Sequence, residues 1–546
     1  MNRGRAPRSC SFGDGSLPGL GGGRSLFSLL AVLVGFLTLS SCAERDHALA
    51  DAMGNSIRAE KLAEVEQFRR SNLIDPASTT SDRESEPATL EGLQILDLES
   101  AILLATKNNR NYKSQRESFF QSALSLGVTR RDFLRPVFSG SASFNASDGT
   151  SQDYQEVTGL SVGGSQFLYT GGTLSLSTSA TRSWVEGVDP VDPVADGGFS
   201  ASFSQPLLRG AGHDIAFESL TQAERNLLYS ARNFELFRQS FVIQISQKFF
   251  GLLSQEKQLV NTQENIDGQQ FAYDQAKALF RIGTGSSLDV FRAEQALLVA
   301  QNSRLNSIQQ FLLAVDNFKI DLGISTDTEI ELEGEFPVVT AFELDPDQAV
   351  LAALNNRLDI RTTRDQLEDA RRRLDLARNG LLPSLGLTVG YSSFADPQID
   401  FGDLDFADDE AYSVGVALEL PFDRLSRRNS FRNSEISLDQ ALRTLDQQED
   451  EISIEVRSSL RTLEQLRFQI EIGEKTIESF SFTVEKAEID QLRGLGTNRD
   501  VVEAKNSLTE SKNDQLDRIV DHEIQLLRLQ NQLGLLFVDE KGTVSQ

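Results

Sequence analysis

The chain has 546 residues, and its 80 acidic against 53 basic side chains give a net charge of −27. This charge argues against nucleic-acid recognition through a basic face, because the phosphate backbone would be repelled. The sequence has two cysteines and three histidines that lie far apart, which excludes a disulfide framework and argues against a metal centre or a catalytic relay. We therefore expect a protein that is no enzyme and that has neither cofactor nor metal.

The N-terminus is predicted to be a lipoprotein targeting segment. Basic residues precede an apolar run over residues 26–39, which is too short to span a bilayer and typical of a signal-peptide core. The run ends in Leu39-Ser40-Ser41-Cys42, which resembles a bacterial lipoprotein cleavage site. We predict a signal peptide over residues 1–41 and lipidation of Cys42, and by the same resemblance Ala43 favours the outer membrane. An ordinary signal peptide with a chance cysteine is the alternative.

Long helices are predicted for much of the remaining chain. Residues 42–92 are polar and are predicted to form a lipid-anchored tether, helical near residues 59–70. Residues 207–336 and 422–546 contain no proline and carry apolar residues at helical spacing, which predicts very long helices. Two glycine-containing turns interrupt these stretches, at Gly283-Thr284-Gly285 and at Gly494-Leu495-Gly496.

The sequence contains one internal duplication. Asn108-Asn109-Arg110 recurs as Asn355-Asn356-Arg357 with an offset of 247 residues, and the two glycine-containing turns recur with an offset of 211. Constant offsets of this kind indicate a duplicated unit. The change of offset means that the first half is longer in its middle, between Pro136 and Pro206.

The middle segments of both halves alternate apolar and small polar residues, as in residues 138–147 and 385–392. This period of two predicts β-strands. Because the chain must return to the side it left, we predict four strands over residues 137–206 and two over residues 384–421. One apolar face is typical of transmembrane strands, although a soluble sheet alternates in the same way. Six strands are too few to close a membrane barrel. Several chains must therefore share a single barrel.

Residues 93–537 resemble the TolC family of outer-membrane efflux proteins. The resemblance lies in the duplicated order, in the junctions at Pro136 and Pro383, in the segment Ser204-Gln205-Pro206-Leu207-Leu208-Arg209-Gly210 and in the paired glycine-containing turns. It implies a mixed α and β fold in which both repeats, residues 93–336 and 337–537, supply β-strands and very long antiparallel helices. Residues 538–546 follow as a C-terminal tail.

The resemblance also implies an assembly and a function. It predicts a homotrimer with a β-barrel shared between protomers in the outer membrane and a tunnel that extends into the periplasm. The function is then that of an outer-membrane channel in a tripartite efflux or type I secretion system. Such a passive export duct works with a periplasmic adaptor protein and an inner-membrane pump. The family usually has four strands per chain, so the extra hairpin predicts either an 18-stranded barrel or an insertion outside the membrane. The alternative function is a non-conducting coiled-coil lipoprotein of the envelope.

By the same resemblance, the turns over residues 283–288 and 494–499 dock the adaptor. The docking residues are Gly283, Thr284, Gly285, Gly494, Leu495 and Gly496. Asp500 matches an entrance aspartate of the family, Glu503 follows on the same helix face, and Asp289 is the counterpart of Asp500 in the first turn. Carboxylates from three copies would surround the entrance and favour cations. Capping of the returning helices alone also explains the two aspartates.

Overall fold

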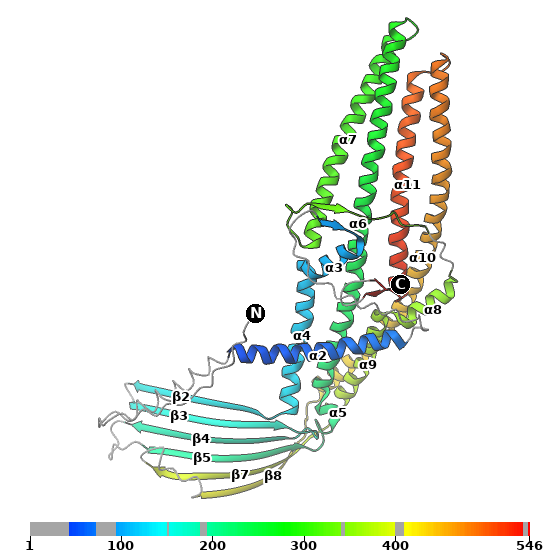
Figure 1. Ribbon diagram of the computed structural model, residues 1–546. Helices are drawn as coiled ribbons and strands as arrows, with labels where there is room; N and C mark the ends of the chain where they lie inside the picture. The colour runs from blue at the N-terminus through cyan, green and yellow to red at the C-terminus, as the bar shows by residue number, and fades with distance from the viewer. Residues whose placement is uncertain are drawn as a thin grey trace, which may run out of the picture.

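The computed structural model describes residues 43–71, 94–149, 152–185, 194–339, 344–398, 409–538 and 544–545. The predicted signal peptide and Cys42 lie outside these ranges. Among the helices within them, none combines the length and the apolar character that crossing a membrane requires. The structure has a β-sheet at one end and a bundle of long helices at the other (Figure 1).

Six of the described strands form one antiparallel sheet in the order β2-β3-β4-β5-β7-β8 (Figure 1). They are β2 (Val137–Gly149), β3 (Gln152–Phe167), β4 (Thr173–Val185), β5 (Val194–Pro206), β7 (Ser384–Gln398) and β8 (Asp409–Glu419). Pro136 and Pro383 stand directly before β2 and β7. Proline lacks an amide N–H and disfavours helix in the residue before it, and the preceding helices end before these prolines, at Leu134 and at Asn379.

The extra hairpin of the first half lies inside this sheet. β3 pairs with β2 on one side and with β4 on the other, in an unbroken antiparallel register from Gln155↔Val185 to Phe167↔Thr173. The turn between β3 and β4 holds Gly171 at a φ of 87°, which favours glycine. A Cβ on Gly171 would come within 2.7 Å of the carbonyl oxygen of Gly210. The turn is therefore packed against the chain that leaves β5.

Four long helices form a layer that extends from the sheet (Figure 1). They are α6 (Glu218–Arg281), α7 (Ser287–Leu322), α10 (Leu425–Leu492) and α11 (Asn498–Gln532). The four helices pack side by side in the order α7-α6-α11-α10. With 64 residues in α6 and 68 in α10, each of these two helices is about 100 Å long.

Shorter helices join the sheet to this layer in both halves. They are α3 (Leu98–Asn108) and α4 (Arg110–Leu134) in the first half, and α8 (Pro346–Asn356) and α9 (Leu358–Asn379) in the second. Asn109 caps α4 and donates from its side-chain amide to the carbonyl of Asp321, 2.7 Å away.

The remaining described elements are short. Helix α5 (His213–Ala216) precedes α6, and β1 (Gln94–Leu96) pairs in parallel with β6 (Ile330–Leu332). A terminal pair joins β9 (Phe537–Val538) to β10 (Val544–Ser545).

The helix α9 is tied to α6 by the buried carboxylate of Asp369, which is 1% exposed. Arg225 and Arg372 approach it within 3.3 and 2.9 Å, and the hydroxyl of Tyr229 donates to it over 2.7 Å. Burial, together with the bond to this carboxylate, raises the pKa of Tyr229 to about 12. Since an unpaired charge is costly in such surroundings, this cluster fixes α9 on α6.

Helix α2 (Ala43–Ser71) crosses α4 and also contacts α6 (Figure 1). Sequence patterns predict a helix only near residues 59–70, but the helix begins at Ala43. Gly54 and Gly127 allow the close crossing, since a Cβ on Gly54 would lie 2.6 Å from the ring of Phe120 and one on Gly127 would lie 2.1 Å from Met53. Packing against α4, which the local sequence does not reveal, therefore accounts for the added turns.

Candidate functional site

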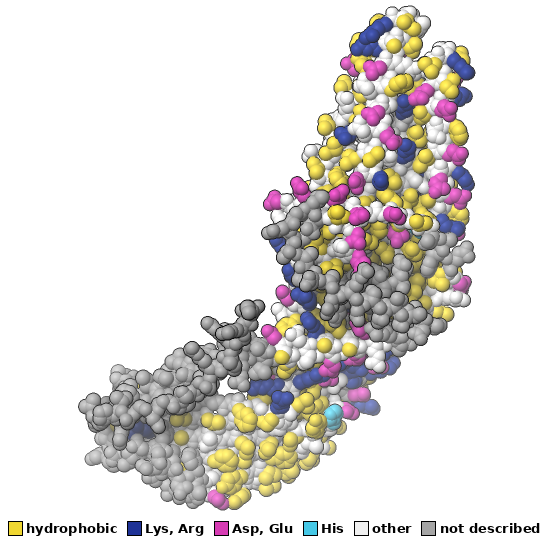
Figure 2. All heavy atoms as spheres, in the orientation of Figure 1, with side chains coloured by type: hydrophobic (Ala, Val, Ile, Leu, Met, Phe, Trp, Pro, Cys, Tyr) yellow, Lys and Arg dark blue, Asp and Glu magenta, His cyan; other side chains and the backbone are white. Residues whose placement is uncertain are grey.

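One face of the sheet is apolar and exposed. Leu176 on β4 lies in one cross-strand row with Phe138, Ala201, Tyr391 and Tyr412. In the single chain, Phe138 is 73% exposed and Tyr412 is 75% exposed, and Figure 2 shows hydrophobic side chains gathered over the sheet. An apolar surface of this extent marks a contact with lipid or with another protein.

The opposite face carries small polar side chains. Its central cross-strand row runs over all six described strands through Ser139, Gly163, Ser177, Ser200, Ser392 and Ala411. The next row toward the helices contains Ser165, Ser175, Ser202, Gly390 and Ser413, with Val137 at its β2 end. Hydroxyls bond across strands, as between Ser177 and Ser200 over 2.7 Å. The sheet therefore has one face suited to lipid and one suited to water.

Within the described part of the chain, the two edge strands of the sheet each have a partner on one side only. β2 pairs with β3, and β8 pairs with β7. All of the pairings are antiparallel, so β2 and β8 run in opposite directions. An edge with free backbone groups is costly in lipid. A second copy of the chain, related by rotation, would place its β2 antiparallel to β8 and would satisfy these groups.

The two glycine-containing turns lie at the far end of the helical layer (Figure 1). The first joins α6 to α7, and the second joins α10 to α11. Gly283 and Gly494 have φ values of 80° and 73°. Only glycine adopts such positive φ values without strain, so these residues let the chain reverse direction. Leu495 is 79% exposed at the second turn. All six residues predicted to dock an adaptor therefore lie at this end.

The predicted entrance carboxylates lie on the first turns of the returning helices. Asp500 accepts hydrogen bonds from the backbone N–H and the hydroxyl of Thr497, both at 2.8 Å, in a capping box. The backbone bond holds the pKa of Asp500 below its usual value. Glu503 lies 3.8 Å from Arg499 in an exposed pair, and Asp289 lies in the first turn of α7, which Ser286 caps. The structure thus gives Asp500 a capping role.

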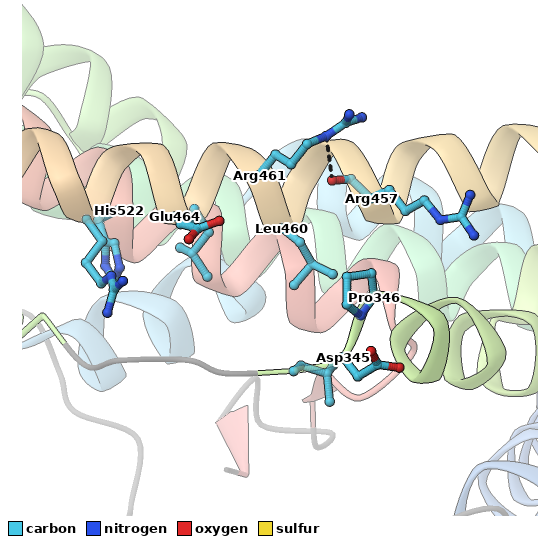
Figure 3. Close-up of a pocket in the computed structure, with 10 residues that line it drawn as sticks. Asp345, Pro346, Arg457, Leu460, Arg461, Glu464 and His522 are labelled. Carbon is cyan, nitrogen blue, oxygen red and sulfur yellow. Dashed lines mark hydrogen bonds between the residues drawn. The ribbon is translucent and has the colours of Figure 1, made fainter.

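A pocket of about 580 Å³ lies farther along the helical layer (Figure 3). Its lining comes from α10, from α11 and from the chain before α8. His522 borders it and is 2% exposed, and burial, aided by the charge of Arg467, lowers the pKa of its imidazole. Arg457 pairs with Asp347 over 2.9 Å, while Arg461 donates to the carbonyl of Arg457 (Figure 3). No sequence motif marks this pocket, since its residues are far apart in the chain.

The family model of the outer membrane efflux protein matches residues 172–318 and 350–535. The chain belongs to the outer membrane efflux protein family. The two matched segments contain β4, β5, β7 and β8, together with the long helices. Its relatives are channel proteins and not enzymes. No curated sequence matches the chain.

Solved structures of efflux channels have the same fold as this outer membrane efflux protein. CusC is 17% identical, with a TM-score of 0.62 over 84% of this chain and 99% of CusC. CmeC of Campylobacter jejuni is 16% identical, with a TM-score of 0.59 over 85% and 93% of the two chains. MtrE of Neisseria gonorrhoeae is 14% identical, with a TM-score of 0.59 over 84% and 96%. The mixed helical and sheet architecture is therefore that of outer-membrane efflux channels.

Proposed function

We propose that three copies of this chain form a passive export channel of the outer membrane. The channel would serve a tripartite efflux or type I secretion system, with a periplasmic adaptor protein and an inner-membrane pump as partners. The observation that carries the proposal is the two-faced sheet with open edges, continuous with a layer of long helices. Such a chain is incomplete alone, because neither its lipid-facing sheet nor its layer closes on itself.

Closure by rotation fits both parts of the molecule. The opposite directions of β2 and β8 allow an antiparallel pair at each junction between copies. In the helical layer, α7 and α10 are the edge helices, because α7 packs on α6 and α10 packs on α11. α7 carries exposed apolar residues at intervals of seven, at Phe291, Leu298, Leu305 and Leu312. Such a stripe is suited to packing against a helix of a neighbouring copy. Three is the number of copies that the family resemblance implies.

The remaining parts of the proposal concern the two ends of the channel. Lipid on Cys42 would anchor the chain in the outer membrane beside the sheet, and α2 follows this residue directly. At the other end, the turns at Gly283 and Gly494 would meet the adaptor. Asp500 and Glu503 of three copies would surround the periplasmic entrance, where their charge would favour cations. The exposure of both turns and the ionised state of Asp500 support these roles.

The mass and the conductance of the purified full-length protein test the channel. We expect a trimer in detergent and ion conductance after insertion into a planar bilayer. A monomer without conductance would contradict the proposal and favour the non-conducting coiled-coil lipoprotein. The apolar sheet face argues against that alternative, since a spacer in water would leave this surface uncovered.

A further inference from the structure

We propose that the barrel closed by three copies has 18 strands and encloses a wide passage whose wall is rich in serine hydroxyls. This passage would admit hydrated polymers that are too bulky for a 12-stranded barrel. The inference rests on the proposed function, because it takes three copies and membrane insertion as given. It goes beyond that function in assigning the width and the chemistry of the outer-membrane pore.

The inserted hairpin contributes to the barrel wall and is no appendage. β3 and β4 lie between β2 and β5, and the register is unbroken from β3 to β4 and from β4 to β5. The hairpin's turn is also fixed, since the amide N–H of Gly212 donates to the carbonyl of Thr170 over 3.3 Å. Removing the hairpin from the wall would therefore require breaking the centre of the sheet.

The width of the sheet matches that of the helical layer. With a strand spacing of about 4.8 Å and a tilt of about 40°, six strands cover an arc of about 38 Å. Four helices packed about 9 Å apart cover an arc of about 36 Å. The two rings formed by three copies would then have nearly equal circumferences. Four strands would cover only about 25 Å of arc, so a barrel built from them would be narrower than the ring of helices that it joins.

The lumen would be wide, and one cross-strand row of its wall would carry only short, uncharged side chains. A closed barrel of 18 strands measures about 36 Å between opposite backbones, against about 24 Å for 12 strands. The central row on the polar face holds only serine, glycine and alanine in the described strands. These side chains are short, so most of the width stays open. They carry no charge, while Asp196 and Asp409 lie on the same face nearer the ends of their strands that point away from the helices.

Two adjacent cysteine substitutions test the width of the passage. Ser177 lies on the polar face and its neighbour Leu176 on the apolar face, because successive side chains of a strand alternate. Full-length Ser177→Cys and Leu176→Cys proteins would be reconstituted in liposomes. Each would be treated with a small water-soluble maleimide or with a maleimide on polyethylene glycol of hydrodynamic radius about 11 Å, which fits 18 strands but not 12. The unsubstituted protein gives the background of Cys10 and Cys42.

We expect both reagents to label Ser177→Cys in the folded protein and neither to label Leu176→Cys efficiently. Both variants should label fully after denaturation in detergent, which shows that each thiol is intact. If the small reagent labels Ser177→Cys and the polymer does not, the wide passage is wrong while the channel stands. If Ser177→Cys stays unlabelled by both, or if Leu176→Cys labels equally fast, the sheet does not enclose a water-filled pore. The proposed function and this inference then fail together.

Discussion

Gly323 lies against the main chain of Asn108, so closely that a Cβ on Gly323 would come within 2.4 Å of the carbonyl carbon of Asn108. The second half repeats this contact between Gly534 and Asn356. In both halves the end of a long helix thus meets the end of a short one. Each glycine also has a positive φ, 73° and 70°. The duplicated unit is therefore closed by one contact that only glycine permits.

This contact predicts that Gly323→Ala destabilises the protein more than Gly283→Ala. Both positions have a positive φ, which costs alanine about 1 to 2 kcal/mol. A Cβ on Gly283 meets nothing within 4 Å, whereas one on Gly323 clashes with backbone. We expect roughly 2 kcal/mol more destabilisation for Gly323→Ala, measured as a shift in the thermal unfolding of the purified protein. Equal shifts would show that the close approach does not matter.

The buried carboxylate between α6 and α9 predicts a second contrast. Asp369→Ala should destabilise by about 3 to 5 kcal/mol, because it removes a buried carboxylate that contacts both Arg225 and Arg372. The neighbouring Glu368→Ala is the matched control. Glu368 pairs with Arg225 from an exposed position, and its loss should cost about 1 kcal/mol or less. Chemical denaturation of the two variants compares them, and similar losses would contradict a buried role for Asp369.

His522 predicts a loss of stability in mild acid. Its pKa is lowered in the folded protein, first by burial, so the unfolded chain binds a proton at a higher pH than the folded one. Its stabilising contribution is therefore complete above the ordinary pKa of histidine, about 6.5, and declines as the pH falls below it. His522→Gln should remove this part of the decline. Melting temperatures at about pH 7.5 and about pH 5.5 would show a smaller difference for the variant than for the unsubstituted protein.

On acidification, Glu523 contributes in the opposite direction, because burial raises its pKa in the folded protein. Only the difference between His522→Gln and the unsubstituted protein isolates the histidine, because the carboxylate is common to both. If the two proteins lose stability equally on acidification, the buried imidazole is not responsible.

The entrance carboxylates predict block of the channel by multivalent cations. Asp500→Ala combined with Glu503→Ala should weaken this block in planar bilayers, because both substitutions remove negative charge from the proposed entrance. The lowered pKa of Asp500 keeps it ionised below the usual pKa of a carboxyl group, so block should persist into mild acid. Thr497→Val removes the capping hydroxyl but no charge and is the control. Unchanged block in the double variant would remove both residues from the entrance.

Replacement of the first 42 residues by a cleavable signal peptide without a lipidation site tests the membrane attachment. We expect the protein to lose incorporation of labelled palmitate but to remain in the outer-membrane fraction, because the sheet holds it there. A coiled-coil lipoprotein held only by lipid would instead appear in the soluble periplasmic fraction. Unaltered palmitate labelling would show that Cys42 is not the acceptor.

Local sequence patterns predicted the elements whose signals are local. Alternation places strands within residues 137–206 and 384–421, and the glycines at 283 and 494 mark the reversals between long helices. Tertiary contacts were not predicted, because they join residues far apart in the chain and leave no local sequence signal. The helix before residue 59 packs against Gly127 through Met53 and Ile57, and the cluster at Asp369 joins residues about 140 positions apart. The sequence offers helix capping as the alternative role of Asp500, and the structure shows the capping bond. A role at the entrance stays a prediction.

The position of the inserted hairpin lets the width of the barrel change independently of the long helices. It adds two strands, an even number, so β2 and β8 keep their opposite directions and the rule for joining copies is unchanged. No described long helix is altered by it, because it begins and ends within the sheet. Gain or loss of such hairpins would give lineages a way to adjust pore calibre while the surfaces that meet other envelope components stay constant.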